Sequence, residues 1–100
     1  MSEDKTWFVY IMTNGRRGTL YVGVTGDLVR RVSQHREHTF EDSFTDRYDL
    51  TTLVWYEAFG DPTAAIAREK QLKNWRRAWK VDLVEATNST WRDLWDEIVG

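Results

Sequence analysis

Three segments decide the fold of this chain: WFVYIM at residues 7–12, LYVGVT at residues 20–25 and DLVRRVSQH at residues 27–35. The first is apolar at odd and even positions alike, which is typical of a strand covered on both faces, so we predict a central strand. Residues 14–18 follow it and contain two glycines, which we expect to adopt backbone angles that other residues avoid. The second segment alternates apolar residues with Tyr21 and a glycine, so the first two segments predict a β-hairpin.

The helix predicted after the hairpin has Asp27 as its N-cap. At about 100° per residue, its buried stripe is formed by three apolar residues: Leu28, Val29 and Val32. Arg31 and His35 flank this stripe one turn apart, whereas Arg30 points to solvent. This geometry selects Arg31 as the arginine near the sheet.

The rest of the chain predicts one more strand and three more helices. Residues 36–49 are polar and without a clear period, so we expect a loop, interpreted as a flap on the substrate side. Residues 50–59 are rich in β-branched and aromatic types and predict a third strand. Helices are expected over 62–73, over 78–84 and, as a short last element, over about 90–98. The expected fold class is α+β, with a small central three-stranded antiparallel sheet flanked by helices.

Length and composition bound the class of protein. One hundred residues make a single domain over 1–100, with its core expected over about 6–88. A content of 41% hydrophobic and 30% charged residues is ordinary for a folded chain. There is no apolar run near the roughly 18 residues of a membrane span, so we expect no membrane partner. The sequence holds no cysteine, and its start lacks the pattern of a secretory signal, so the expected location is cytoplasmic.

The charge is unevenly distributed. A net charge of −2 and a pI near 5.6 argue against a protein that coats nucleic acid by bulk electrostatics. Residues 68–80, however, carry six cations and one acid, and residues 41–49 carry four acids and one arginine. A basic segment on an acidic body suits a weak, oriented contact with phosphates. The alternative is a solvated helix face without a partner.

Two sequence blocks resemble the GIY-YIG endonuclease family. The first triplet of that family reads here as VYI at residues 9–11, having lost its glycine, and the second as YVG at residues 21–23. Residues 65–75 resemble the helix on which the family carries its single metal-binding glutamate, which is Glu69 here. The resemblance covers nearly the whole chain. It is closest to small stand-alone members with a single domain, similar to the N-terminal nuclease domain of the bacterial excinuclease.

This resemblance implies a divalent-metal-dependent endonuclease that hydrolyses phosphodiester bonds of nucleic acid. DNA is favoured over RNA, in a repair or recombination setting. Tyr10 would activate water with His35 as its proton relay, and Tyr21 would position the water or the phosphate. Arg31 would stabilise the charge that develops on the phosphate. Glu69 would bind one Mg²⁺ or Mn²⁺ ion together with waters and substrate phosphate.

The roles of Glu69 and Tyr10 both require a charged side chain whose formation costs free energy. Glu69 falls within the apolar stripe of its helix, where an ionised carboxylate costs several kcal/mol unless it is paired or coordinated. The alternative to a metal is an ion pair with Lys73, four residues on. A phenol has a pKa near 10, so the anion of Tyr10 at pH 7 costs about 4 kcal/mol. A neighbouring cation would have to lower that pKa, or the proton would have to pass to His35.

Further substrate contacts are expected from the basic segment and from one asparagine: Arg68, Lys73, Arg76, Arg77 and Asn88. Asn88 precedes Ser and Thr and is equally well interpreted as a residue that ends a helix. Val24 occupies the position where DNA-repair members often carry a lysine. The missing first glycine, Val24 and the acidic pI support an alternative function, a nucleic-acid-binding or protein-recruiting module that has lost the reaction.

The last predicted helix allows an alternative for its tryptophans. Thr90 and Asp93 resemble a capping box at its start. Trp91 and Trp95 on this helix could be core residues or an interface patch. In the second case they would form a weak homodimer.

Overall fold

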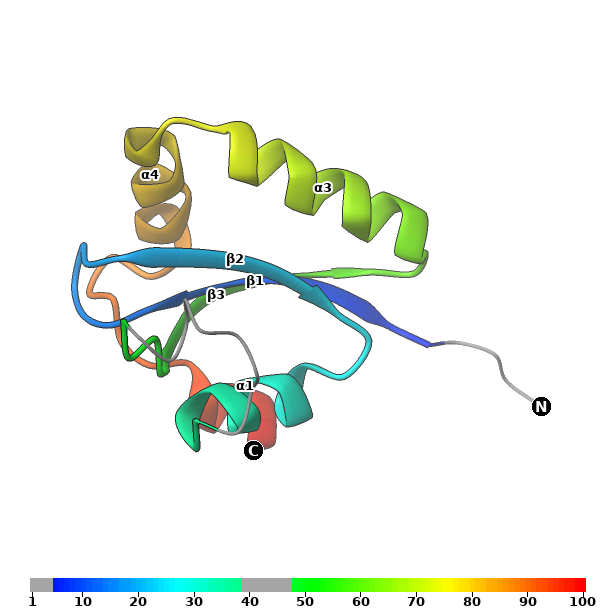
Figure 1. Ribbon diagram of the computed structural model, residues 1–100, viewed down its shortest axis with the longest axis horizontal. Helices are drawn as coiled ribbons and strands as arrows, with labels where there is room; N and C mark the ends of the chain where they lie inside the picture. Colours follow the sequence, from blue (N-terminus) through cyan, green and yellow to red (C-terminus); the bar gives the residue numbers. More distant parts are fainter. Residues whose placement is uncertain (1–4, 39–47) are drawn as a thin grey trace.

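The computed structural model describes residues 5–38 and 48–100. In it, three antiparallel strands form one sheet. Helices cover both faces of this sheet (Figure 1). The elements are β1 (Trp7–Thr13), β2 (Leu20–Thr25), α1 (Leu28–Arg36), β3 (Thr52–Phe59), α3 (Pro62–Asn74), α4 (Arg77–Thr87) and α5 (Trp95–Val99). The strand order is β2-β1-β3, so the first strand is central, as predicted. Most of the predicted flap, residues 39–47, lies outside the described residues.

Strand β1 separates two apolar clusters. Val9 and Ile11 belong to a cluster with residues of α3 and α4, and Tyr10 and Met12 belong to a cluster with residues of α1. All four side chains are fully buried. Figure 1 shows α3 and α4 on one side of the sheet and α1 on the other. The apolar pattern on both faces of β1 is thereby explained, and the predicted α+β class is confirmed.

The turn between β1 and β2 differs from the prediction. Arg17 has the positive φ, 53°, and no glycine among the described residues has one. Gly18 is needed for space instead, because a Cβ there would lie 2.1 Å from Oδ1 of Asn14. That oxygen accepts a hydrogen bond from the Thr19 N–H at 3.0 Å. The side chain of Asn14 thus fills the place that a larger residue at position 18 would need.

Helix α1 begins as predicted, but its buried stripe is shifted toward His35 and away from Val29. The Asp27 carboxylate accepts a hydrogen bond from the Arg30 N–H at 3.1 Å and caps the helix. Leu28 and Val32 are buried together with His35, whereas Val29 is 40% exposed. The predicted place of Val29 in the buried stripe was therefore wrong. The stripe is turned toward His35 because the imidazole has a buried partner on β1.

The C-terminal segment is helical only from Trp95. Before it, Oδ1 of Asp93 accepts hydrogen bonds from the backbone N–H groups of Trp95 and Leu53. Trp91 is 5% exposed, and its Nε1–H donates to Glu85 at 2.7 Å. Because this ring is part of the core, it has little surface with which to contact a second copy. The predicted homodimer would therefore have to form through Trp95. Among the described residues, no helix has the length and apolar character needed to cross a membrane.

Candidate active site at the edge of strand β2

Three aromatic side chains meet on the α1 face of the sheet. The ring centroids of Tyr10 and His35 are 5.8 Å apart, those of Tyr21 and His35 are 5.3 Å apart, and those of the two tyrosines are 6.2 Å apart. The Tyr10 hydroxyl and Nε2 of His35 form a buried hydrogen bond of 3.1 Å. The tautomer of the imidazole sets its direction. The structure therefore brings together three of the four predicted catalytic residues through direct ring contacts.

A glycine makes this cluster possible. Gly23 pairs with Tyr10 across the β1–β2 ladder, and a Cβ on Gly23 would lie 2.6 Å from the Tyr10 hydroxyl oxygen. Any side chain at this position would occupy the space of the phenol. The second triplet thus ends in glycine because the first tyrosine lies across it.

The fourth residue, Arg31, acts on the same hydroxyl. Burial raises the pKa of Tyr10 well above its ordinary value of 10, and the neighbouring Tyr21 raises it further. The charge of Arg31 and its hydrogen bond to the phenol lower the Tyr10 pKa but do not outweigh burial. The phenol is therefore neutral at neutral pH. Of the two routes considered above, a nearby cation or a proton relay, the relay to His35 is the one this arrangement favours.

Burial also separates the two tyrosines. Tyr10 has no exposed surface, so its hydroxyl has no direct access to a water molecule outside the protein. Tyr21 lies on edge strand β2 and is partly exposed. Tyr21 is thus the phenol at the surface, with Tyr10 and His35 behind it.

Glu69 lies on α3, which covers the other face of the sheet. Ala65 and Leu72 are the buried residues of this helix, and the line through them faces the sheet. Arg68 and Glu69 lie on opposite sides of that line. Nε of Arg68 donates to Glu57 on β3 at 3.1 Å, so the Arg68 flank faces the β3 edge. Because the strand order is β2-β1-β3, Glu69 faces the β2 edge.

Helix α1 also has one flank toward β3 and one toward β2. Arg36 bonds to Asp93 at 2.7 Å on the α5 side, and α5 lies beside β3, where Tyr56 donates to Glu97 at 2.7 Å. Arg31 lies on the opposite flank of α1 and therefore also faces the β2 edge. Helices α1 and α3 lie on opposite faces of the sheet (Figure 1). Arg31 and Glu69 thus approach the β2 edge from opposite faces. Tyr21 is on the strand between them.

Glu69 has an ion-pair partner. Nζ of Lys73 lies 3.1 Å from its Oε2, and the lysine and glutamate side chains are 53% and 16% exposed. No group of three or more His, Cys, Asp or Glu side chains that could hold a metal is found within residues 5–38 and 48–100. A single carboxylate still fits a hard divalent ion that keeps most of its waters. The exposed Lys73 would have to move aside for such an ion.

The remaining predicted substrate-binding residues do not form one site. Arg68 is engaged with Glu57 and stacks 5.3 Å from the Trp75 ring centroid. Arg77 donates to the backbone carbonyls of residues 17 and 18. Arg76 lies over the exposed Trp79, 5.5 Å from the ring centroid.

Asn88 is buried at the end of α4. Its amide donates to the carbonyls of Val54 and Arg92 and accepts from the Arg92 N–H. This gives Asn88 a structural task that the helix-ending interpretation anticipated. Its contact with substrate stays a prediction.

The sequence of this chain also matches a known protein family. The GIY-YIG catalytic domain matches residues 6–82, which span β1 through the first half of α4. The chain belongs to the GIY-YIG family. It is thus a member of a nuclease family whose enzymes typically depend on divalent metals. The family match includes every predicted catalytic residue and Glu69.

Individual relatives of this GIY-YIG chain are UPF0213 proteins. One from Aeromonas hydrophila is 35% identical over 78 residues, which are 78% of this chain and 56% of the relative. One from Desulfotalea psychrophila is 33% identical over 86 residues, covering 86% of this chain and 77% of the relative. One from Yersinia pestis is 31% identical over 82 residues, covering 82% and 84%. This chain therefore spans little more than half of the Aeromonas hydrophila protein. No solved structure matches it.

Sequence reasoning did not identify two cationic side chains near the site. Lys5 lies against Gly26, where a Cβ would be 2.5 Å from the lysine Cε. Arg30 is exposed, as predicted, and it lines a polar hollow together with Lys5 and Arg31. The glycine in the link between β2 and α1 was the available signal, because it leaves the space that Lys5 occupies.

Proposed function

We propose that this protein is a divalent-metal-dependent endonuclease whose substrate strand lies along the edge of β2. The observation that carries the proposal is the buried hydrogen bond between Tyr10 and His35, with Tyr21 in front of it and Arg31 beside it. The hydroxyls of Tyr21 and Tyr10 lead from the edge strand to the imidazole of His35, and such a proton relay suits general base catalysis.

In this proposal Tyr21 contacts the attacking water. As the water oxygen bonds to phosphorus, its proton passes to the Tyr21 oxygen, and the Tyr21 proton passes to Tyr10. The Tyr10 proton then passes to Nε2 of His35. The bond from phosphorus to the departing sugar oxygen breaks, and that oxygen takes up a proton from a solvent water. The buried pair thus accepts one net proton without forming a stable phenolate, whose formation burial opposes.

Arg31 has a separate task in the same proposal. Its guanidinium faces the β2 edge and can donate two N–H groups to the phosphate oxygens on which charge develops. The same side chain interacts with the Tyr10 hydroxyl. Arg31 would therefore join phosphate binding to proton transfer.

Glu69 would hold the divalent ion from the α3 side of the edge. Its half-buried carboxylate is a suitable single oxygen ligand, and waters and a substrate phosphate would complete the coordination. When bound, such an ion supplies Lewis-acid stabilisation of the phosphate charge. The same carboxylate pairs with Lys73, which would favour the alternative of a binding module without cleavage if that pair persisted.

We propose DNA as the substrate, in a repair or recombination setting and within the cytoplasm. Lys5, Arg30 and Arg31 line a hollow at the end of β2, and such cations bind phosphates, whose contacts carry no base sequence. Recognition of strand structure therefore fits this small domain better than recognition of a long sequence.

A panel of labelled DNA and RNA substrates tests the proposed function. Wild type, Glu69→Ala and Tyr21→Phe would be incubated with single strands, flaps and duplexes in the presence of Mg²⁺ or Mn²⁺. We expect metal-dependent nicking by wild type and a loss of about a hundredfold or more in either variant. A protein that binds these substrates but cleaves none with either ion would support the binding module instead. Unchanged cleavage by Glu69→Ala would reject its metal role.

A further inference from the structure

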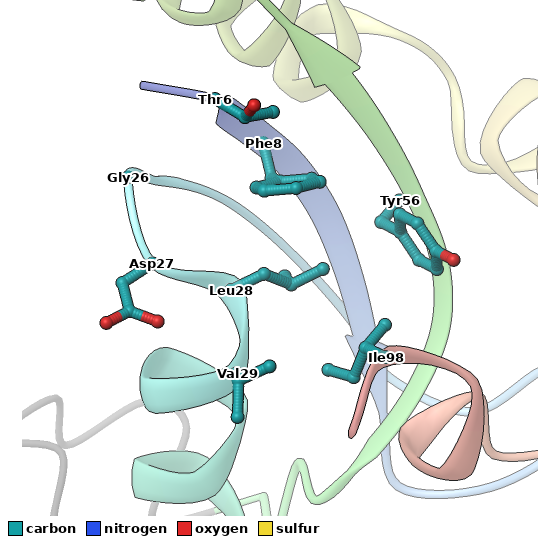
Figure 2. A pocket seen from close by; sticks show the side chains of 8 residues that line it. All are labelled: Thr6, Phe8, Gly26, Asp27, Leu28, Val29, Tyr56 and Ile98. Atoms are coloured by element: carbon teal, nitrogen blue, oxygen red, sulfur yellow. The ribbon is translucent and has the colours of Figure 1, made fainter. Parts of the chain in front are cut away.

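An apolar hollow lies beside the start of α1. It has a volume of about 450 Å³, a size typical of small-ligand sites. Figure 2 shows the side chains of Phe8, Leu28, Val29, Tyr56 and Ile98 around it. Phe8 and Tyr56 pack edge to face with centroids 6.2 Å apart, and Val29 is 40% exposed. A flat aromatic ligand in this hollow would contact one pair of aromatic rings and three aliphatic side chains.

A second hollow, of about 340 Å³, lies on the other flank of the same helix start. Its lining includes Lys5, Arg30 and Arg31 and one acid, Asp27. One carboxylate oxygen of Asp27 already accepts a hydrogen bond from the Arg30 N–H and thereby caps the helix. Three cations against one acid, which is itself hydrogen-bonded, make this hollow suited to an anion.

The two hollows share a wall. Gly26 and Asp27 line both of them, so the apolar and the basic spaces lie on the two sides of a single turn. Arg31 belongs to the basic hollow and also interacts with Tyr10 of the candidate active site. An aromatic space next to a basic one, which shares Arg31 with the candidate active site, matches the base and the phosphate of a nucleotide.

We propose that the two hollows form a subsite for one unpaired nucleotide of the substrate strand. Lys5 and Arg30 bind its phosphate, and the apolar hollow takes its base against Phe8. The subsite rests on the proposed endonuclease function and narrows its substrates. A base in this hollow cannot be paired, and opening a pair costs a few kcal/mol. Strands with an unpaired nucleotide beside the cleaved bond are therefore cut faster than continuous duplex.

One pair of variants tests the base position through cleavage. Val29→Glu places a carboxylate at the mouth of the apolar hollow, and the side chain it replaces is exposed, so the fold is kept. Val99→Glu is the matched control, because Val99 is 46% exposed on α5 and does not line the hollow. We expect Val29→Glu to lower flap cleavage by about tenfold or more, the loss expected when base stacking is removed. Val99→Glu is expected to cleave like wild type. Equal cleavage by the two variants would overturn the base position.

A binding measurement without metal tests the subsite independently of catalysis. Thymidine 5′-monophosphate, thymidine and inorganic phosphate would each be titrated into ¹⁵N-labelled protein. We expect the nucleotide to shift the backbone amides of Gly26, Leu28 and Ile98, and phosphate alone to shift Gly26 but not Ile98. Lys5→Ala should weaken nucleotide binding severalfold, whereas Arg16→Ala, with the same loss of charge in the distant β1–β2 turn, should not.

The two experiments separate the subsite from the proposed function. Nucleotide shifts at these amides in a protein that cleaves nothing would keep the subsite and reject the endonuclease. Cleavage without such shifts, or equal nucleotide affinity in Lys5→Ala and Arg16→Ala, would reject the subsite and keep the endonuclease.

Discussion

Gly23 and Tyr10 share one space on the α1 face of the sheet, because a Cβ on Gly23 would lie 2.6 Å from the phenol oxygen of Tyr10. The glycine of the second triplet is therefore a requirement of packing. It keeps the phenol within 3.1 Å of His35.

Gly23→Ala should disturb the site directly. The added methyl forces the Tyr10 ring to move, and a shift near 1 Å in a catalytic group can lower the rate about a hundredfold. Overpacking should also lower the free energy of unfolding by about 1–3 kcal/mol. Gly15→Ala is the control, because nothing lies within 4 Å of a Cβ there. Nicking assays and urea unfolding would measure both effects, and equal behaviour of the two variants would contradict the packing argument.

Tyr10 should make stability depend on pH at the alkaline end. Its pKa is raised by burial, so the native protein keeps the phenolic proton at pH values where the unfolded chain loses it. Below pH 10, about the pKa of the phenol in the unfolded chain, the contribution of Tyr10 to the free energy of unfolding is fully present. Above that pH the free energy of unfolding decreases by about 1.4 kcal/mol per pH unit. Urea unfolding across this range should show a shallower decrease for Tyr10→Phe. Parallel curves for the two proteins would show that Tyr10 ionises normally in the fold.

Asn88 offers a choice between a structural role and contact with substrate. Its side chain donates hydrogen bonds to two carbonyls and accepts one from an N–H. Asn88→Ala should therefore lower the free energy of unfolding by about 2–4 kcal/mol. Asn74→Ala, at the exposed end of α3, should change it little. A stable Asn88→Ala protein with weakened DNA binding would instead favour the substrate contact.

The basic segment should contribute unevenly to DNA binding. Arg76 lies over an exposed tryptophan, whereas Arg68 is paired with Glu57. We expect Arg76→Ala to lower the slope of log affinity against log salt by about 1, the value for one lost phosphate contact. Arg68→Ala should leave the slope nearly unchanged. Fluorescence anisotropy at several salt concentrations measures both, and a larger effect at Arg68 would reverse the assignment.

Periodicity predicted the parts of the site that lie on one strand or one helix. The apolar residues on both faces of β1 predicted a central strand, and the helical projection selected Arg31 over its neighbour. Projection alone could not say which flank of Leu28 is covered, and the covered flank carries His35 because that imidazole bonds to Tyr10.

Relations between elements were harder to predict from the sequence. The resemblance assigned Glu69 and the two tyrosines to one site, but the helix of Glu69 covers the face of the sheet opposite the tyrosines. Only the strand order and the contact between Arg68 and Glu57 indicate that Glu69 faces the β2 edge. The late start of α5 depends on Asp93, whose carboxylate is held by the distant Leu53 N–H and by Arg36. Such partners cannot be inferred from local spacing.

The proposed function requires that substrate and ion meet at the β2 edge between Arg31 and Glu69. Paramagnetic broadening by Mn²⁺ measures where the ion binds, with ¹⁵N-labelled protein bound to a phosphorothioate oligonucleotide that resists cleavage. We expect the amides of Tyr21 and Glu69 to broaden most, those of Glu57 and Phe59 on β3 to broaden less, and Glu69→Ala to abolish the effect. Broadening that is strongest on β3, or unchanged broadening in Glu69→Ala, would show that the ion binds elsewhere.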